Sequence, residues 1–572
     1  MASAAPEVTF DYVIVGAGSA GCLMANRLSA NPDHRVLLIE AGGEDDWFWI
    51  KIPVGYLHTI AHPRTDWCFK TEPDAGLAGR SIHYARGRVI GGSSSINAMI
   101  YMRGQASDYA RWAEATSDEG WLWGADGGPG QTLSIYRDLE DFFAGSDPWH
   151  GAGGEMRVEP PRVRWKILDA WQRAAAEQGI ATISEFNRGD NAGCAYFHMT
   201  QRRGRRWSMA DAFLHPIRHR KNLTVWSQTQ ALTILTKGLP TPSAKAQGAW
   251  QQAGLKATGL RLLRNGELLT AQARKEVILC AGAICSPQLM QVSGLGPGAA
   301  LQAHQIPVRL DLPGVGENLQ DHLQIRTVFK IHGAPTVNTL YRNLFTRAGM
   351  GLEYLLFRRG PLTMPPSTLG AFAKSDPSLP SADLEWHVQP LSLPKFGEPL
   401  HPFGAITPSV CHLRPSSRGS VRVRHADPLA APIIDCRYLS TEDDLHAARV
   451  GLRLTRRIMA SPALSAFAPE EFLPGPEMQS DEDLTQAARE LGTTIFHPVG
   501  TCAMGAFTSQ GEPRSRQTVL DSACRVRGVE GLRVVDASAM PFITSGNTNA
   551  PVMLIAERTA RAMLASSSSQ AR

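Results

Sequence analysis

A group of glycines near the start of the chain has the spacing of a nucleotide-binding turn. Gly16, Gly18 and Gly21 form the pattern G-x-G-x-x-G, and Ser19 lies inside it. Glycines at these positions permit a tight turn, close approach of the backbone to a pyrophosphate and close packing of a helix on a strand. Glu40 follows about 20 residues later, where an acid can bind ribose hydroxyls. The pattern predicts a dinucleotide site but does not distinguish FAD from NAD.

The elements around these residues are the ones that such a site requires. Residues 10–15 read as a short buried strand, and residues 36–39 as a second strand that ends at Glu40. Between them, apolar residues recur at helical spacing directly after the glycines. This β-α-β order predicts parallel strands in an α/β fold. The competing interpretation is an ordinary glycine turn followed by a surface carboxylate, and the combined pattern makes it the weaker one.

Two longer segments carry a more specific pattern. Residues 87–104 read GRVIGGSSSINAMIYMRG, and residues 282–296 read GAICSPQLMQVSGLG. They resemble the two signatures of the glucose–methanol–choline (GMC) oxidoreductases, and the resemblance covers nearly the whole chain. It is nearest to the bacterial alcohol dehydrogenase and choline dehydrogenase branch. The resemblance implies FAD rather than NAD, and a Rossmann-like FAD-binding domain with an interleaved antiparallel-sheet substrate domain, α/β locally and α+β overall.

The resemblance also implies which residues contact the cofactor. In the first signature and near the chain end these are Arg88, Gly92, Ser93, Asn97, Asp536 and Ala537. The run of small residues at 91–95 would let the backbone lie against a flat ligand. Some relatives attach FAD covalently through a histidine just before the signature asparagine. Ile96 occupies that position here, and its side chain cannot form such a bond, so we expect noncovalent FAD.

Two further segments resemble the catalytic parts of the family. Residues 496–501 read FHPVGT and residues 546–551 read GNTNAP. The resemblance implies that His497 is the catalytic base and that Asn547 is its partner, with Asn549 as a flavin contact. A neutral imidazole can accept the hydroxyl proton of an alcohol while hydride passes to the flavin. An amide beside it can orient the hydroxyl and donate to the developing alkoxide.

Most of the 17 histidines are expected to be structural. His412 and His322 are kept in that class, the latter because its segment, GENLQDH, resembles a structural segment of the family. No zinc-protease, hydrolase-elbow or phosphate-loop motif accompanies the predicted site.

The chain is long enough for more than one structural unit. We expect an FAD-binding region over residues 1–305, a substrate-binding or cap region over 306–519, and a return to the FAD-binding domain over 520–565. Residues 566–572 are expected to be a disordered tail. Residues 331–400 are rich in proline and aromatic residues, and we expect a lid or a strand-rich substrate domain there.

Composition excludes several other classes of function. The chain has 58 basic and 53 acidic side chains, a net charge of only +5, so no nucleic acid partner is expected. The nine cysteines include no C-x-x-C pair, and we expect neither a disulfide framework nor a metal site. The first residues lack the pattern of a signal peptide, and no apolar run is long enough to span a bilayer. We expect a cytoplasmic protein, with peripheral membrane association left open.

One basic cluster stands out within this balanced charge. It consists of Arg202, Arg203, Arg205 and Arg206. We expect a solvated loop there, with contact to a phosphate or to anionic lipid as the alternative.

The predicted activity is FAD-dependent oxidation of an alcohol, by the nearest resemblance a primary aliphatic one, to the aldehyde. Choline is a second candidate substrate, although no aromatic cage for its ammonium group is recognisable. A non-redox lyase of the hydroxynitrile type, a light-driven fatty-acid decarboxylase and a noncatalytic flavin protein are the alternatives. The presence of His497 and Pro498 counts against the decarboxylase, and the intact pair of His497 and Asn547 counts against the noncatalytic protein. The electron acceptor stays open among a quinone, a soluble carrier and oxygen.

Overall fold

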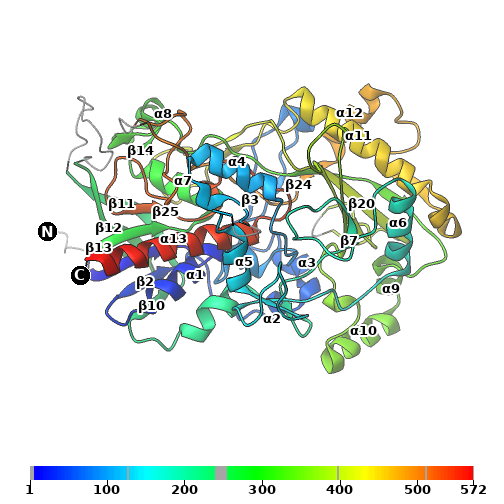
Figure 1. Cartoon of the computed structure of the whole chain (residues 1–572), viewed down its shortest axis with the longest axis horizontal. Coiled ribbons are helices and arrows are strands. Elements are labelled where there is room, and N and C mark those ends of the chain that lie inside the picture. The colour runs from blue at the N-terminus through cyan, green and yellow to red at the C-terminus, as the bar shows by residue number, and fades with distance from the viewer. Residues whose placement is uncertain (1–5, 125–127, 239–253, 396–397, 509–511, 571–572) are drawn as a thin grey trace.

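The computed structural model describes most of the chain, namely residues 6–124, 128–238, 254–395, 398–508 and 512–570. Two large sheets organise these residues, one toward the left of Figure 1 and one toward the right. Both ends of the chain lie on the left.

The first sheet is a mixed sheet of seven strands within the described residues. Its strands run in the order β10 (Leu223–Trp226), β2 (Val36–Ile39), β1 (Glu7–Val15), β13 (Glu267–Leu279), β12 (Lys256–Arg264) and β11 (Thr229–Lys237), and β25 (Leu532–Val534) pairs with β13. The strands from β10 to β13 are parallel, as is the β13–β25 pair, whereas β11 and β12 are antiparallel. The predicted α/β arrangement with a Rossmann-like β-α-β unit is therefore confirmed.

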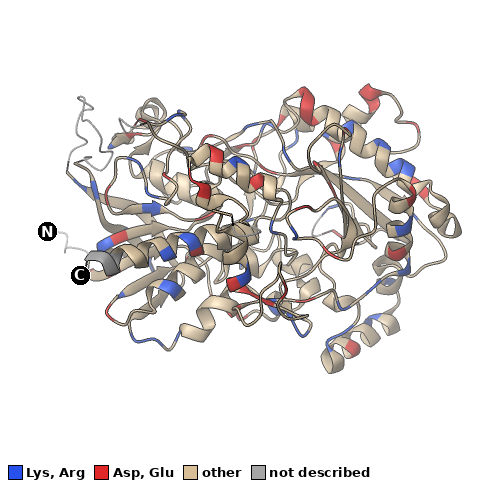
Figure 2. Cartoon of the chain, in the orientation of Figure 1, with Lys and Arg blue, Asp and Glu red and all other residues tan. Residues whose placement is uncertain are grey.

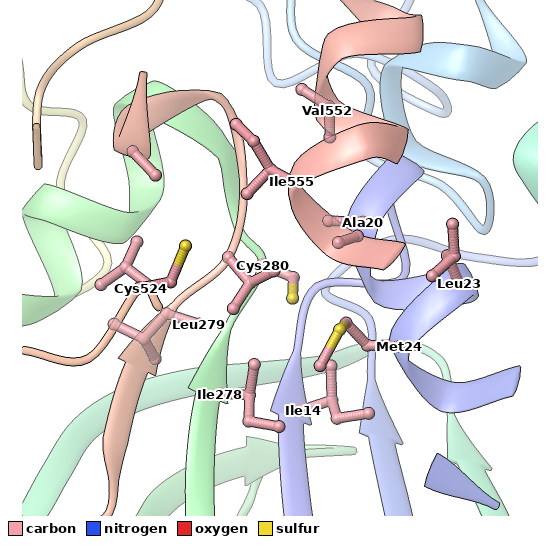
Figure 3. Close-up of a cluster of buried hydrophobic side chains, with 14 of the residues drawn as sticks. Ile14, Ala20, Leu23, Met24, Ile278, Leu279, Cys280, Cys524, Val552 and Ile555 are labelled. Atoms are coloured by element: carbon pink, nitrogen blue, oxygen red, sulfur yellow. The ribbon is translucent and has the colours of Figure 1, made fainter. Parts of the chain in front are cut away.

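Helices cover this sheet and bury its strands. The three helices that matter for the site are α1 (Ser19–Leu28), α7 (Gly282–Val292) and α13 (Asn549–Gln570). Ile14 of β1 pairs in register with Ile278 of β13. Figure 3 shows both side chains gathered with Met24 of α1 and with Ile555 of α13. Because helices pack on the parallel strands, these strands read as nearly continuous apolar runs.

The second sheet is antiparallel and has eight strands among the described residues. Its path is β23 (Glu470–Leu473), β17 (Val328–Lys330), β20 (Ala405–His412), β19 (Leu384–Gln389), β18 (Leu369–Ala373) and β7 (Gly193–Tyr196), and β16 (Leu323–Arg326) joins β20 to β24 (Gly492–Thr494). The helices of this half are α6 (Lys166–Glu177), α9 (Val337–Arg342), α10 (Leu344–Phe357), α11 (Glu442–Met459) and α12 (Asp481–Leu491).

Shorter elements complete the fold. The remaining helices are α2 (Phe48–Lys51), α3 (Tyr56–Thr59), α4 (Ala106–Thr116), α5 (Thr132–Leu139) and α8 (Gly298–Ala303). In the part of the chain that the structure describes, five small pairs of strands accompany them: β3 (Phe69–Lys70) with β4 (His83–Tyr84), β5 (Glu140–Phe142) with β6 (Met156–Val158), β8 (Gln201–Arg202) with β9 (Arg205–Arg206), β14 (Leu295–Gly296) with β15 (Leu310–Asp311), and β21 (Ser420–Arg422) with β22 (Ile433–Asp435).

The two hydrophobic cores do not divide at the boundaries expected from the sequence. Trp171 of α6 and Cys194 of β7 belong to the core of the second sheet, although both lie in the expected FAD-binding region 1–305. Conversely, the chain rejoins the first core by Val499, ahead of the expected return at 520. Long-range packing decides this membership, so local sequence patterns do not reveal it.

The end of the chain also differs from the sequence expectation. Helix α13 continues to Gln570, so it includes part of the segment 566–572 for which a disordered tail was expected. A serine hydroxyl inside a helix can donate to the carbonyl oxygen one turn back. Ser566 does this, because its Oγ lies 2.9 Å from the carbonyl oxygen of Ala562.

Candidate active site

A cavity of about 270 Å³ is lined by elements of both sheets. It is lined by nearly all the residues that the sequence assigned to the site: Gly16, Gly18, Ser19, Glu40, Gly92, Ser93, Asn97, His497, Asp536, Ala537, Asn547 and Asn549. Gly21 and Arg88 are not among its lining residues. The structure therefore brings together, in one space, side chains that are up to several hundred residues apart in the chain.

The glycine turn forms part of the cavity wall. Gly16 has a φ of +97°, and a Cβ there would lie 2.6 Å from the carbonyl oxygen of Cys280. A Cβ on Gly21 would lie 1.8 Å from the carbonyl oxygen of Gly16, which explains why Gly21 packs the helix rather than lining the cavity. No side chain caps the N-terminus of α1. Its unpaired N–H groups and positive dipole end can accept an anion such as a pyrophosphate.

Glu40 is buried at the end of β2, and both of its carboxylate oxygens accept backbone hydrogen bonds. Oε2 lies 3.0 Å from the amide nitrogen of Ala17, and Oε1 lies 2.8 Å from that of Gly42. Burial raises the pKa of Glu40 to about 7. The carboxyl group therefore braces the glycine turn while it lines the cavity.

A second helix start faces the same region. Asn549 begins α13, and its Oδ1 accepts a hydrogen bond of 2.7 Å from the Oγ of Ser19. Asp536 lies nearby under the turn that follows β25, where it accepts hydrogen bonds from the amide of Gly282 and the hydroxyl of Ser286. Burial raises the pKa of Asp536. Its side chain also caps the short turn at Ala537–Ala539, where it accepts a hydrogen bond from the amide of Ser538, and it lines the cavity.

Arg206 differs from the sequence expectation of a solvated arginine loop. Its side chain is only 1% exposed, and Nη1 lies 2.7 Å from Oδ1 of Asn97. Nε of Arg206 also donates to the carbonyl oxygen of Ile50. The guanidinium group thus holds the signature asparagine against the cavity. Arg202, Arg203 and Arg205, by contrast, are exposed as expected.

Arg88, like Gly21, was predicted to contact the cofactor but does not line the cavity. Its guanidinium carbon lies 4.8 Å from the centroid of the Trp67 ring, and Trp67 itself lines the cavity. The backbone of Arg88 approaches Gly42, where a Cβ would lie 2.0 Å from the Arg88 carbonyl oxygen. Arg88 therefore supports the site through neighbouring groups.

The predicted catalytic pair is in direct contact. Nδ2 of Asn547 lies 2.9 Å from Nε2 of His497, and both side chains are buried. Oδ1 of Asn547 has no hydrogen-bond partner among the described residues. Phe496, just before the histidine, has a φ of +67°, which is unusual for a bulky residue and is typical of functional sites.

Hydrogen bonds behind His497 determine which ring nitrogen carries its proton. Nε2 of His322 lies 3.0 Å from the carbonyl oxygen of Leu413, which can only accept, so Nε2 of His322 is protonated. Nδ1 of the neutral His322 ring is then an acceptor for Nδ1–H of His497, 3.0 Å away. This leaves Nε2 of His497 with a lone pair directed toward Asn547.

Asp321 fixes the backbone of both histidines. Its Oδ1 accepts hydrogen bonds from the amides of His322 and His497, at 2.9 and 2.8 Å. Its Oδ2 accepts hydroxyl hydrogen bonds from Tyr84 and Thr494. Sequence reasoning missed these roles, because it classed the segment that contains Asp321 and His322 as structural. The signal that could have revealed them is the family resemblance of that same segment.

Electrostatics keep His497, the predicted catalytic base, neutral. Burial, followed by the neighbouring rings of His322 and His387 and the charge of Arg86, lowers the pKa of His497 well below its usual value of 6.5. Burial also lowers the pKa of His322. Two neutral imidazoles are what the hydrogen-bond pattern requires. The site can therefore accept a proton at Nε2 of His497 at neutral pH.

Comparison with known proteins decides the family. The N-terminal GMC oxidoreductase family model matches residues 10–324, and the C-terminal model matches residues 415–556. The chain belongs to the GMC oxidoreductase family. GMC oxidoreductases bind FAD and act on CH–OH donors, so the chain is an FAD-dependent oxidoreductase.

Relatives of this GMC oxidoreductase match over almost their full length. An alcohol dehydrogenase [acceptor] from Pseudomonas putida is 36% identical over 96% of this chain and 95% of its own. An oxygen-dependent choline dehydrogenase from Photobacterium profundum is 36% identical over 98% and 93%. The solved structure of pyridoxine 4-oxidase from Mesorbium loti has a TM-score of 0.82 and 31% identity, covering 96% of this chain and 98% of that one. These likenesses confirm the predicted family and its flavin-dependent alcohol chemistry.

The residues of the cavity fit FAD. A Cβ on Gly18 would meet no atom closer than 3.9 Å, so the glycine leaves open space where a pyrophosphate can approach the uncapped end of α1. Ile96 lines the cavity beside Asn97, at the position where some relatives attach the flavin. Within the family, Gly18, Ser19 and Asn549 would hold the pyrophosphate region, and Asn97 would lie near the flavin ring.

No metal site was expected from the sequence, and two side-chain clusters outside the cavity bear on that expectation. Among the described residues, two clusters bring three potential ligands together: Asp45, Asp211 and His215, and Asp147, His150 and Glu185. In the first, the ammonium group of Lys51 lies 2.6 Å from Asp45 and 2.8 Å from Asp211. In the second, His150 is paired with Glu140. Neither cluster lines the cavity.

Proposed function

We propose that this GMC oxidoreductase oxidises a primary, aliphatic alcohol to the aldehyde with noncovalently bound FAD. The observation that carries the proposal is the lone pair on Nε2 of His497, held beside Asn547 at the cavity wall. Bound FAD supplies the hydride acceptor.

The chain's own residues activate the alcohol. In the substrate complex the hydroxyl would replace Nδ2 of Asn547 as the donor to Nε2 of His497, and the Asn547 amide would donate to the hydroxyl oxygen instead. As hydride leaves the carbinol carbon, the hydroxyl proton moves to Nε2, and the Asn547 amide stabilises the oxygen as negative charge develops. His322 accepts from Nδ1–H throughout, so the imidazolium that forms keeps its orientation. Removal of one proton and one hydride from the alcohol gives the aldehyde.

The chemistry of the cavity favours an aliphatic alcohol over choline. The second sheet and the segments that flank its strands contribute Gln324, Pro366, Ser367, His387, Gln389, Ile495 and Phe496 to the cavity lining. An ammonium group is usually bound by several aromatic rings or by a carboxylate. The only carboxylates that line the described cavity, Glu40 and Asp536, are both committed to backbone hydrogen bonds of the cofactor region. The choline dehydrogenase relatives make choline the second candidate.

The identity of the electron acceptor is a separate question from the identity of the alcohol. The Pseudomonas putida relative is named for an unspecified acceptor, while other relatives are oxygen-dependent. We propose a dehydrogenase that passes electrons from reduced flavin to a quinone or another carrier, with oxygen as the alternative acceptor.

The test is an anaerobic titration of the purified FAD enzyme with primary alcohols of increasing chain length, and with choline. Loss of the visible flavin absorbance identifies each compound that reduces the enzyme. The proposal predicts reduction by aliphatic alcohols, with stronger apparent binding as the chain lengthens. Reduction by choline alone would move the assignment to choline. Absorbance that stays unchanged with every alcohol, while a hydroxynitrile is cleaved, would favour the lyase.

A further inference from the structure

Helix α10 exposes an unusual amount of apolar surface. Half of the large exposed apolar side chains in the described part of the chain lie on it: Leu344, Phe345, Leu352, Leu355, Leu356 and Phe357. Phe345 is 88% exposed and Leu344 is 73% exposed. Phe345, Leu352 and Leu356 are seven and four residues apart, so they lie along one face of the helix. Contiguous exposed apolar surface of this kind marks an interaction site.

The helix is attached to the protein body by few contacts. Tyr354 is its single buried residue, and the Tyr354 hydroxyl donates to the carbonyl oxygen of Gly204 at 3.2 Å. A Cβ built on Gly349 or on Gly351 would meet no atom within 4 Å. Figure 1 shows α10 projecting at the lower right of the molecule. Intramolecular packing therefore does not account for its apolar residues.

Arginine side chains surround the same helix. The β8–β9 hairpin, which carries Arg202, Arg203 and Arg205, contacts the C-terminal part of α10 through Gly204. Further arginines lie on or beside the helix at Arg342, Arg347, Arg358 and Arg359. None of these seven groups forms an ion pair with a carboxylate anywhere in the described residues. In Figure 2, α10 is mainly tan, and Glu353 is its one acidic residue.

The helix is also close in the chain to the wall of the cavity. It is followed by a short turn at Pro361–Thr363, and Pro366 and Ser367 directly after that turn line the cavity that contains His497. The segment that follows α10 therefore connects the helix to one wall of the substrate space.

We propose that α10 and its arginine rim dock the protein on an anionic lipid bilayer. An amphipathic helix with apolar residues on one face and arginines around it binds in the plane of such a surface. With 14 residues it is too short to cross, because a span needs about 20. None of the described helices combines the length and apolar character of a membrane span. The apolar face inserts below the headgroups, and the arginines contact lipid phosphates.

The test is flotation of the FAD enzyme with vesicles of phosphatidylcholine and phosphatidylglycerol at 3:1, and with phosphatidylcholine alone. We expect binding to the anionic vesicles that weakens with added salt, and at least tenfold weaker binding to the neutral ones. The double variant Phe345→Gln/Leu356→Gln should lose at least tenfold in binding, because two inserted apolar side chains are removed. Arg203→Gln/Arg205→Gln should lose about tenfold on anionic vesicles only.

The matched control is Phe143→Gln/Leu268→Gln, which removes two exposed apolar side chains far from α10 in the chain. It should float like the wild type. Equal flotation of the α10 variant and the wild type, or no binding to anionic vesicles at low salt, would overturn the proposal. A dimer in sedimentation velocity that disappears with Phe345→Gln/Leu356→Gln would instead assign the helix to self-association. Vesicle binding does not depend on the alcohol oxidised, so this result and the proposed reaction can fail separately.

Discussion

The protonation of two histidines controls the chemistry assigned to this site. His497 acts as a base only if Nε2 carries a lone pair, and the chain of hydrogen bonds from Leu413 through His322 produces that tautomer. Asp321 holds both backbones at the required spacing. The sequence indicated His497 and Asn547 through their motifs. It could not indicate the His322 contact, because 175 residues separate the two rings in the chain.

The lowered pKa of His497 predicts the pH dependence of catalysis. The neutral ring is the active form, and burial favours it, so acidification should slow flavin reduction only at a pH below 6.5. The measurement is the anaerobic rate of flavin reduction by a primary alcohol as a function of pH. An acid limb centred at or above 6.5 would show that His497 is not the buried neutral base.

His322 is predicted to act as a positioning residue. In His322→Leu, Nδ1–H of His497 loses its acceptor, and flavin reduction should slow by about tenfold or more. The acid limb should also move to lower pH, because the imidazolium form of His497 loses the acceptor that stabilises it. His322→Gln restores an acceptor oxygen and should recover most of the rate. If the Leu and Gln variants share one rate and one pH profile, His322 serves packing alone.

At the scale of elements, the glycine turn shows what sequence can and cannot predict. Strands at 10–15 and 36–39 were predicted because buried parallel strands are continuous apolar runs, and β1 and β2 confirm them. By contrast, β13 runs from Glu267 to Leu279, and only its last residues, from Val277 on, form a continuous buried apolar run. Residues 267–276 of β13 are exposed or only partly buried over most of their length, and residues 267–272 pair with β12, so this part of the strand lacks such a run.

Substitutions at two glycines of this turn should affect two different properties, apoprotein stability and FAD affinity. Gly21→Ala would place a methyl group 1.8 Å from the Gly16 carbonyl oxygen, and it should destabilise the apoprotein by about 1–3 kcal/mol. Gly18→Ala meets no protein atom closer than 3.9 Å, so apoprotein stability should hold while FAD affinity falls at least tenfold. Denaturant unfolding and FAD titration measure the two effects. Equal FAD affinity in Gly18→Ala and wild type would remove the pyrophosphate from this turn.

At the scale of the whole molecule, one cavity depends on both sheets. Gly18 and Glu40 line it from the first sheet region, whereas Gln324 and His387 line it from the second. The sequence predicted two interleaved domains but misplaced their limits, since β7 lies within the segment 1–305 yet pairs with β18 of the second sheet. Pairing between strands that are distant in the chain depends on tertiary structure, so local sequence patterns do not reveal it.

A cofactor held between the two sheets without a covalent bond should leave on denaturation. We expect acid precipitation to release all of the flavin into the supernatant, because Ile96 occupies the attachment position. Added FAD should raise the melting temperature of the apoprotein, since it binds only the folded chain. Flavin absorbance that stays with the washed pellet would contradict the noncovalent assignment.

The measurement that tests the account most directly is anaerobic stopped-flow reduction of the flavin by a primary aliphatic alcohol in wild type and in His497→Ala. Removing the base should slow reduction by about 10²–10⁴-fold while FAD stays bound. His219→Ala changes an exposed histidine that does not line the cavity, and it should reduce at the wild-type rate. Reduction of His497→Ala at the wild-type rate, with full FAD content, would contradict the assignment of His497 as the base.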